Sequence, residues 1–335
     1  MLQPQLVPLG NTGLFVSRLG LGLAALGRPG YITLHHGQDL GGHYQPGELA
    51  TRAHDVLSAA YEHGIRYIDA ARSYGRSEEF LASWLATHEL SRGPIVVGSK
   101  WGYTYTAGWH VHADHPEVKD HSVAALRRQL GETLDRLGEH LSLYQIHSVT
   151  AESTVLSDAA VLDLLLETRA ARGIHIGLSV SGDRQGEVIR RALDVERHGE
   201  RVFEVVEATW NLVERGADAA LAAARAAGMG VLVKEALSNG RLADPSGDPR
   251  LAGRLRPLYD AARRVGTSPD ALSIAAALAR PWADTVLSGA MTAQQLESNV
   301  AALAIPWDPA LEEMLVPLTM PSAEYWRLRQ TFAWN

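Results

Sequence analysis

The feature that most constrains the fold is the alternation of short apolar runs with longer helical segments along the chain. Eight runs have the length and the β-branched or aliphatic character of buried strands. Alternating strands and helices favour right-handed crossovers and a parallel sheet. Eight such units in 335 residues predict an α/β fold of the (β/α)8 TIM barrel type with parallel strands. The runs are residues 19–24, 67–71, 95–101, 141–148, 175–181, 202–210, 230–237 and 284–290.

The segment before the fourth run shows helical spacing most clearly. Its apolar residues step by 3, 4, 4 and 3 positions, which places them on one face of a helix at about residues 120–138. They are Val123, Leu126, Leu130, Leu134 and Leu137.

A doubly wound sheet is the competing arrangement, and it normally carries a Gly-x-Gly-x-x-Gly turn after its first strand. The first run reads "LGLGLAALG", whose glycines have a different spacing and precede no helical pattern. The barrel is therefore the better prediction. The opening "LGNTGLFVSRLG" predicts a β-hairpin around residues 11–13 that caps the bottom of the barrel.

No linker-like segment divides the sequence, so we expect one barrel domain over residues 1–335. Irregular composition predicts long loops at about residues 25–48, 102–118 and 238–253, and a C-terminal tail after about residue 304. In a barrel these three loops follow strands and lie at the C-terminal face, where barrels build their active sites.

Composition excludes several classes of protein. The net charge of −7 argues against nucleic-acid and anionic-membrane partners, and the absence of cysteine excludes disulfides and thiolate metal sites. No apolar run approaches the length of a membrane helix, and the first residues lack a signal-peptide pattern. We expect a cytoplasmic protein with a small-molecule substrate; the sequence leaves its oligomeric state open.

Four titratable side chains gather at the ends of predicted strands. Asp69, Lys100 and His147 lie at or near the C-terminal ends of their runs, and Tyr74 lies just beyond one. Each alone has an ordinary explanation: a helix cap, a surface charge, a buried histidine or a loop aromatic. A common function explains all four more economically.

Strand alternation predicts which neighbours share a face with these residues. If Lys100 points into the barrel, Val96 does so too. In the fourth run, His147 is expected to share its face with Leu143 and Leu141.

Together the four side chains suit proton transfer. A buried lysine paired with an aspartate stays cationic, and its charge is expected to lower the pKa of the Tyr74 phenol from about 10. Tyr74 could then give a proton to a carbonyl oxygen or take one from an alcohol, while His147 hydrogen-bonds the same oxygen. No side chain supplies a hydride, so carbonyl chemistry implies a nicotinamide cofactor.

Seven segments in order resemble the aldo-keto reductase superfamily: "LGNTGLFVSRLGLG", "IDAARSYGRSEEFL", "VVGSKWG", "LYQIHS", "GLSVSG", "WNLVERG" and "GAMTAQQLESNVAAL". The resemblance implies a (β/α)8 barrel that binds NAD(P) in an extended form without a dinucleotide-binding fold. It also implies that Asp69, Tyr74, Lys100 and His147 form the catalytic tetrad, with Tyr74 as the proton donor or acceptor.

The resemblance places further positions at the cofactor, some with unusual residues. Ser179 keeps a serine of the nicotinamide site, whereas Val180 replaces an asparagine, Glu207 a glutamine and Lys234 a stacking aromatic residue. The remaining cofactor positions implied by the resemblance are Leu237, Gly289, Gln295 and Asn299.

The adenine end favours NAD as cofactor. Relatives specific for NADPH grip the 2′-phosphate with a lysine or arginine near the last strand, but residues 287–299 contain no basic residue. The hypothesis is NAD, or use of NAD and NADP without a strong preference for NADP.

Aromatic residues are candidates for the substrate pocket. Trp101 follows Lys100, and Trp326 lies in a tail that, with Tyr325 and Trp334, could form a wall for a sugar or a ring. A metal site in the loop after Trp101 is conceivable, but a solvated loop needs no metal and none is expected. Its ligands would be His110, His112 and His115.

The sequence therefore predicts an NAD(P)-dependent oxidoreductase that moves a hydride between nicotinamide and an aldehyde or ketone, or the corresponding alcohol. A sugar or related polyol is a candidate substrate. Two alternatives remain: a regulatory module of the same fold that binds cofactor with negligible turnover, and a lyase that forms a Schiff base on Lys100.

Overall fold

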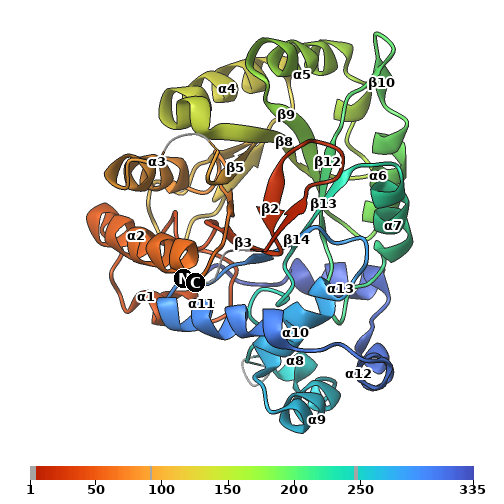
Figure 1. Ribbon diagram of the computed structural model, residues 1–335. Coiled ribbons are helices and arrows are strands. Elements are labelled where there is room, and N and C mark those ends of the chain that lie inside the picture. Colours follow the sequence, from red (N-terminus) through yellow and green to blue (C-terminus); the bar gives the residue numbers. More distant parts are fainter. Residues whose placement is uncertain (1–4, 91–92, 245–247) are drawn as a thin grey trace.

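The computed structural model describes residues 5–90, 93–244 and 248–335, and it contains a closed barrel of parallel strands. Each strand of the barrel pairs with the next one in sequence, and the last closes on the first (Figure 1). This confirms the predicted TIM barrel. Its strands are β3 Leu19–Gly22, β4 Tyr67–Asp69, β5 Val96–Trp101, β8 Leu141–Val149, β9 His175–Val180, β12 Val205–Thr209, β13 Gly230–Lys234 and β14 Thr285–Ser288.

Helices follow the strands and surround the barrel (Figure 1). The predicted helix before the fourth barrel strand is present as α4 Val123–Leu137, and the Ser122 hydroxyl caps it by accepting a bond from Ala125 N at 3.2 Å. The other helices of the barrel are α2 Pro46–Glu62, α3 Ser77–Thr87, α5 Ala159–Arg172, α6 Gln185–Leu193, α7 Asp218–Ala226, α10 Pro269–Leu278 and α11 Ala293–Val300.

The predicted hairpin closes the bottom of the barrel. Strands β1 Leu6–Pro8 and β2 Phe15–Ser17 pair antiparallel and lie across the barrel opening in Figure 1. Leu9 and Val16 form an apolar cluster with side chains from the barrel strands, which excludes water from this end. The barrel residues of the cluster are Tyr67, Val96, Leu143, Val205 and Leu232.

One carboxylate ties the hairpin to the barrel. Asp284 Oδ2 accepts hydrogen bonds from Gly10 N at 3.0 Å and from Val231 N at 2.9 Å. Gly10 has a φ of +52°, and a Cβ there would come within 2.2 Å of Gly230 N. The close contact of hairpin and strand therefore requires glycine at position 10.

The predicted loops contain regular structure. Residues 25–48 include α1 His36–Leu40 and the start of α2, and residues 102–118 carry most of a hairpin. This hairpin pairs β6 Tyr103–Tyr105 with β7 Glu117–Lys119. In the third loop, residues 245–247 lie outside the described residues, and the short helix α8 Pro249–Ala252 follows them.

The tail after residue 304 is largely helical, with α12 Pro309–Leu315 and α13 Ser322–Arg329. The domain span of residues 1–335 includes residues 1–4, 91–92 and 245–247, which lie outside the described residues, so the single-domain assignment stays a prediction. The remaining elements are α9 Arg256–Val265, β10 Glu196–Arg197, β11 Glu200–Arg201 and 3-10 turns at Gly138–His140, Val155–Ser157, Ala301–Ala304 and Val316–Leu318.

Strand β8 departs from simple alternation at its start. Val97 pairs with Leu141 and Gly98 with Leu143, so one residue of β8 is extra in this register. Leu143 packs with Val96 in the apolar cluster beneath the hairpin, inside the barrel. Leu141 packs with Val97 in the other apolar cluster of the core. The expectation that Leu141 shares the face of His147 is therefore wrong.

Across the three described ranges, no helix combines the length and the apolar character needed to cross a membrane.

We expect Asp284→Ala to lower the free energy of unfolding by about 2 to 5 kcal/mol, because two buried backbone N–H groups lose their acceptor. Urea unfolding at neutral pH measures this loss. Asp135→Ala, a change at an exposed position of α4, is the control and should alter stability by less than about 0.5 kcal/mol. Equal stability of the two variants would show that the carboxylate does not anchor the hairpin.

Candidate active site

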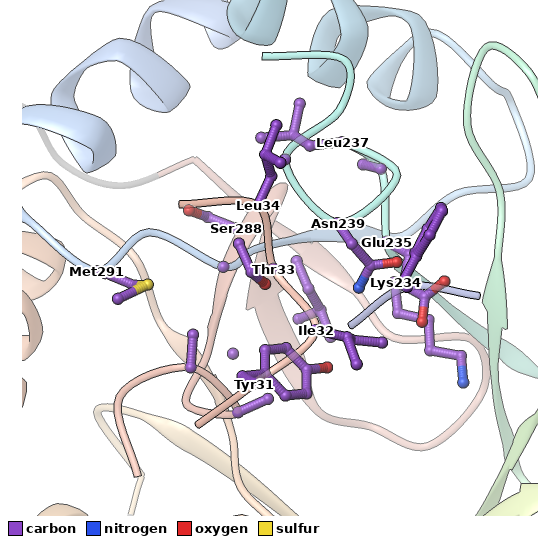
Figure 2. Close-up of a pocket in the computed structure, with 18 of the residues that line it drawn as sticks. Tyr31, Ile32, Thr33, Leu34, Lys234, Glu235, Leu237, Asn239, Ser288 and Met291 are labelled. Carbon is purple, nitrogen blue, oxygen red and sulfur yellow. The ribbon is translucent and has the colours of Figure 1, made fainter. Parts of the chain in front are cut away.

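A cavity of about 580 Å³ lies at the C-terminal ends of the barrel strands. Its lining includes Asp69, Tyr74 and His147 and extends to Gln295 and Asn299. In the view of Figure 2, the segment from Tyr31 to Leu34 lies between Met291 on one side and Lys234 and Glu235 on the other. The volume is in the range of cofactor and substrate sites.

The four predicted catalytic side chains meet at one end of this cavity. Lys100 is fully buried, and its Nζ forms an ion pair with Asp69 Oδ2. The same Nζ lies 3.4 Å from Tyr74 Oη, which in turn lies 3.5 Å from His147 Nε2. A continuous chain of polar contacts therefore runs from a buried carboxylate to the cavity.

A second carboxylate, that of Glu207 on β12, also forms an ion pair with Lys100. Its Oε2 lies 3.3 Å from Lys100 Nζ and accepts a hydrogen bond from Gln145 Nε2 at 3.1 Å. Sequence reasoning placed Glu207 at the cofactor and missed this contact with Lys100. The Lys100 cation thus lies between two carboxylates.

Adjacent strands bring the lysine and the phenol together. Asp69 ends β4 and pairs with Gly98, so Lys100 stands two residues further along β5. The turn that carries Tyr74 begins with a bond from Arg72 N to Lys100 O at 3.0 Å, and Tyr74 N donates to Ala71 O at 3.0 Å. This turn places the Tyr74 phenol next to the Lys100 side chain.

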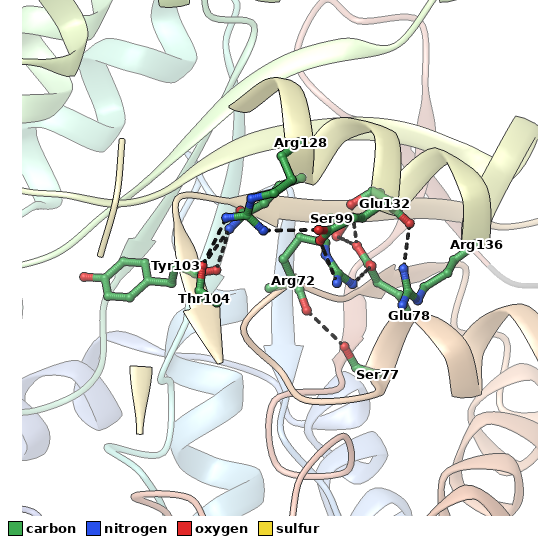
Figure 3. Close-up of polar contacts among 12 residues, drawn as sticks. Arg72, Ser77, Glu78, Ser99, Tyr103, Thr104, Arg128, Glu132 and Arg136 are labelled. Carbon is green, nitrogen blue, oxygen red and sulfur yellow. Dashed lines mark hydrogen bonds and ion pairs between the residues drawn. The ribbon is translucent and has the colours of Figure 1, made fainter. Parts of the chain in front are cut away.

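A polar network behind the site holds this turn in place (Figure 3). The buried Glu78 carboxylate accepts bonds from Arg72 Nη1 at 2.5 Å, Ser99 Oγ at 2.7 Å and Thr133 Oγ1 at 2.8 Å. Arg72 also bonds Glu132 at 3.0 Å. Because Ser99 directly precedes Lys100 and Arg72 lies two residues before Tyr74, the network fixes the segments that carry Lys100 and Tyr74 to α3 and α4.

The electrostatic environment keeps Lys100 charged. Burial alone would lower the pKa of Lys100, but the carboxylates of Asp69 and Glu207 outweigh it and raise that pKa. Burial raises the pKa of Asp69 to about 7, against the opposing effect of Lys100. Lys100 is therefore cationic throughout the physiological pH range.

The pKa of Tyr74 differs from the sequence expectation. Burial raises it well above the ordinary value of 10, although the Lys100 cation acts to lower it. The expected net lowering is not found, because burial outweighs the effect of Lys100, and the Asp69 and Glu207 carboxylates oppose that effect as well. The resting phenol is protonated and can act as a proton donor.

His147 is neutral in this environment. Burial lowers the pKa of His147 well below its usual value, and the cations Lys100 and Lys234 lower it further. Its Nδ1 lies 3.4 Å from Ser73 Oγ, and its ring packs edge-on against Tyr74. A neutral imidazole held in this way can hydrogen-bond an oxygen without adding charge.

The predicted nicotinamide positions lie on neighbouring strands. Lys234, the last residue of β13, donates from Nζ to Ser179 Oγ and Ser181 Oγ, each at 3.1 Å. Glu207 and Lys234 line the cavity, whereas Ser179 is fully buried and reaches it only through its hydrogen bond with Lys234. Val180 is fully buried in the apolar core.

Leu237, Gly289, Gln295 and Asn299, the remaining predicted cofactor positions, also line the cavity. Asn299 Nδ2 donates to Asp270 at 2.9 Å, and Gln295 Nε2 donates to Asp39 at 2.9 Å. Asp39, Asp244 and Asp270 also line the cavity. Their carboxylates come from distant segments that gave no cofactor signal in the sequence.

The two tryptophans predicted for the substrate pocket do not line the main cavity. Trp101 is fully buried in the core outside the barrel, because it alternates with the inward-facing Lys100. Trp326 lines a separate cavity of about 470 Å³, together with Arg184 and Arg327. This arrangement does not support a substrate role for Trp101.

Other residues form the wall near Tyr74. They are Arg28, Tyr31, Tyr103, Glu117 and Trp334. Of these, the tail aromatic Trp334 was a candidate, whereas the others lie in the loops after β3 and β5, whose path the sequence does not reveal. Within the described ranges, no group of three His, Asp or Glu side chains could hold a metal ion, and His110, His112 and His115 form no such group.

We expect Lys100→Met to lower the free energy of unfolding by about 3 to 5 kcal/mol at pH 8, because Asp69 and Glu207 lose their shared cation. Without the Lys100 cation, the buried carboxyl groups of the folded variant keep their protons at higher pH than those of the unfolded chain, which titrate near pH 4. Between pH 5 and pH 8 the folded variant therefore binds more protons than the unfolded chain. The loss should therefore grow as pH rises from 5 to 8.

Thermal unfolding at pH 5 and pH 8 measures this dependence. The exposed Arg127→Met is the control and should show no such growth with pH. A Lys100→Met deficit that is constant or larger at pH 5 would contradict the shared ion pair.

The chain is similar to known proteins over most of its length. The chain is 25% identical over 331 residues to pyridoxal 4-dehydrogenase of Microbacterium luteolum, covering 87% of this chain and 91% of the relative. It is 27% identical over 329 residues to the NADH-specific methylglyoxal reductase of Escherichia coli, covering 89% and 93%.

The fold matches a solved aldo-keto reductase from Bacillus halodurans in its holo form, with a TM-score of 0.73 and 21% identity over 95% of this chain and 97% of that one. The sequence pattern of the Aldo/keto reductase family matches residues 19–312. A closed parallel barrel, a tetrad at its C-terminal face and this match over most of the sequence show that the chain belongs to the aldo/keto reductase family.

Proposed function

We propose that the protein transfers a hydride between a nicotinamide cofactor and an aldehyde or ketone, or the corresponding alcohol, with Tyr74 as the general acid and base. The observation that carries this proposal is the position of Tyr74 Oη, 3.4 Å from Lys100 Nζ and 3.5 Å from His147 Nε2. The phenol faces the cavity, while the lysine lies buried behind it.

In the reductive direction, the substrate carbonyl oxygen binds between Tyr74 and His147. The bound nicotinamide supplies the hydride, and Tyr74 gives its proton to the oxygen as negative charge develops there. The adjacent Lys100 cation stabilises the resulting phenolate. In oxidation, the phenolate takes the proton back from the alcohol.

The cavity fits an extended dinucleotide. It runs from Tyr74 to Asn299, and the segment after β13 lines one side with Glu235 and Asn239 at positive φ. Asn239 Oδ1 is buried without a hydrogen-bond partner among the described residues. A strained backbone and an unsatisfied amide beside a cavity support a ligand-binding role for this segment.

The acidic rim at the far end favours NAD over NADP. Gln295 and Asn299 are bonded to Asp39 and Asp270, and these carboxylates would repel a 2′-phosphate. The E. coli relative is named as NADH-specific, which agrees with this preference. NAD, or both cofactors without a strong preference for NADP, is therefore our proposal.

The wall near Tyr74 supports a ring-shaped or sugar-like substrate. Tyr31, Tyr103 and Trp334 offer aromatic faces, and Arg28 and Glu117 lie beside them with polar groups. Aromatic faces combined with charged groups suit a sugar, a related polyol or an aromatic aldehyde. The Microbacterium relative is named for pyridoxal, an aromatic aldehyde.

The structure argues against a Schiff-base lyase. Lys100 is fully buried and ion-paired with two carboxylates, which raise its pKa and keep it cationic. A protonated amine is not a nucleophile. The regulatory alternative predicts cofactor binding with negligible turnover, so a measured turnover number excludes it.

We expect Tyr74→Phe to reduce turnover by about 10²- to 10⁴-fold, because the proton donor is lost. Cofactor binding should change little. Absorbance at 340 nm measures turnover with NAD and NADP against sugars, aldehydes and ketones, and cofactor fluorescence measures binding. Tyr259→Phe, which lies outside the cavity lining, serves as the matched control. Turnover near the wild-type value in Tyr74→Phe would rule out the proposed proton transfer.

We expect Gly289→Arg to improve NADP affinity by about 10- to 100-fold, because a new cation could form charge-assisted hydrogen bonds to the 2′-phosphate. Gly289 is exposed, and a Cβ there meets no heavy atom within 4 Å, so a side chain can leave the backbone at this position without a clash. Isothermal titration with NAD and NADP measures the effect.

The matched control is Gly253→Arg, which also has open space but does not line the cavity. Unchanged NADP affinity in Gly289→Arg, or an equal gain in Gly253→Arg, would show that this rim does not contact the adenosine.

A further inference from the structure

Arg28, a buried arginine of the wall near Tyr74, has no part in the proton transfer proposed above. Arg28 lies in the loop after β3, is 1% exposed and lines the cavity. A guanidinium is rarely buried unless its hydrogen bonds and its charge are used. Its neighbours therefore indicate its role.

Arg28 binds the segment that carries the catalytic phenol. Its Nη1 donates to the carbonyl oxygen of Ser73 at 2.8 Å and to Glu117 Oε1 at 2.5 Å. Ser73 immediately precedes Tyr74, and Glu117 belongs to β7. One nitrogen thus joins the Tyr74 turn to the hairpin that follows β5.

The guanidinium also packs among aromatic rings. Its central carbon lies 4.6 Å from the ring centroids of Tyr31 and Trp334, and 5.4 Å from that of Tyr74. The last residues are held beside it, because Tyr31 and Asn335 exchange backbone hydrogen bonds of 3.3 and 3.0 Å. Arg28 therefore links three cavity walls that are distant in sequence.

A cation near an aromatic ring is attracted by the ring's electrons. A phenolate ring is richer in electrons than a phenol, so this attraction increases when Tyr74 loses its proton. Lys100 has two carboxylate partners, Asp69 and Glu207, within 4 Å. Arg28 adds a second positive charge near the phenol, with its central carbon 5.4 Å from the ring centroid and with Glu117 as its own ion-pair partner.

We propose that Arg28 is a positioning residue for Tyr74, which it places through the Ser73 carbonyl and whose ionised form its charge favours during turnover. This inference rests on the proposed function, in which Tyr74 exchanges a proton with the substrate. The positioning role itself requires no direct contact between Arg28 and the substrate or cofactor.

Several titratable groups face the two side chains and set the background for a pH test. Arg28 faces Glu117 and Tyr31 in addition to Tyr74. The phenol of Tyr74 is surrounded by groups from the barrel strands and one loop. These groups are Asp69 on β4, Lys100 on β5, His147 on β8, Glu207 on β12 and Tyr31. Lys234 on β13 acts on Asp69 and His147.

The test is the pH profile of kcat/KM for alcohol oxidation, which requires the phenolate and so rises with pH through the Tyr74 pKa. Arg28→Met keeps an apolar side chain but removes the charge. The rising limb should move to higher pH by about one unit. Arg28→Lys keeps the charge and should shift the limb by less.

Glu117→Gln provides a second variant with the opposite expected sign. It keeps the shape of the side chain but removes the counter-charge of Arg28, so the limb should move to lower pH. A general loss of folding would not shift the pH profiles of two variants in opposite directions. If Arg28→Met does not fold, the test rests on Glu117→Gln. A rise of kcat/KM at the wild-type pH or at a higher pH in that variant overturns the proposal.

A second readout needs no cofactor. The ultraviolet difference titration of the phenol, taken as the signal lost in Tyr74→Phe, should have a higher midpoint in Arg28→Met than in wild type. If the titration midpoint of Tyr74 and the pH profile of kcat/KM are unchanged in Arg28→Met and Glu117→Gln, the role of Arg28 is overturned. The proposed function still stands in that case if Tyr74→Phe is inactive. An active Tyr74→Phe removes the proposed function itself.

Discussion

The active-site end of the barrel depends on one buried cation, Lys100, held between Asp69 and Glu207. A charge at this depth is tolerated only when it is paired and hydrogen-bonded, and removing one partner of such a pair typically costs about 3 to 5 kcal/mol. The closed sheet supplies the geometry, because the carboxylates and the amine come from strands β4, β12 and β5. The Glu78 network then fixes the residues next to Lys100 and Tyr74 to the surrounding helices.

The two ends of the barrel have different roles. At the bottom, the hairpin residues Leu9 and Val16 close an apolar floor beneath the strands. At the top, the side chains are polar, and the Lys100 cation is paired with two carboxylates. Burial dominates the pKa of Tyr74 and raises it, although the Lys100 cation acts to lower it. In the proposed reaction, the phenol holds its proton until a substrate oxygen arrives, and nearby cations stabilise the phenolate that results.

The sequence predicted the features that depend on local pattern. Strand and helix periods gave the barrel, and strand-end positions brought Asp69, Lys100 and His147 together. It could not predict features that depend on chain path or side-chain direction. The extra residue in β8 turned Leu141 outward, and alternation buried Trp101 behind Lys100. The walls formed by loops, including Arg28 and the acidic residues near Asn299, depend on contacts between distant segments.

The central claim is that the Lys100 cation serves proton transfer by Tyr74. Carbon-13 NMR of ring-labelled tyrosine, with the Tyr74 signal assigned by its loss in Tyr74→Phe, tests this most directly. The account predicts a neutral phenol at pH 7, whose ionisation midpoint rises when Lys100 is replaced by methionine. A phenolate at pH 7, or a midpoint that does not respond to the loss of the lysine charge, would contradict it.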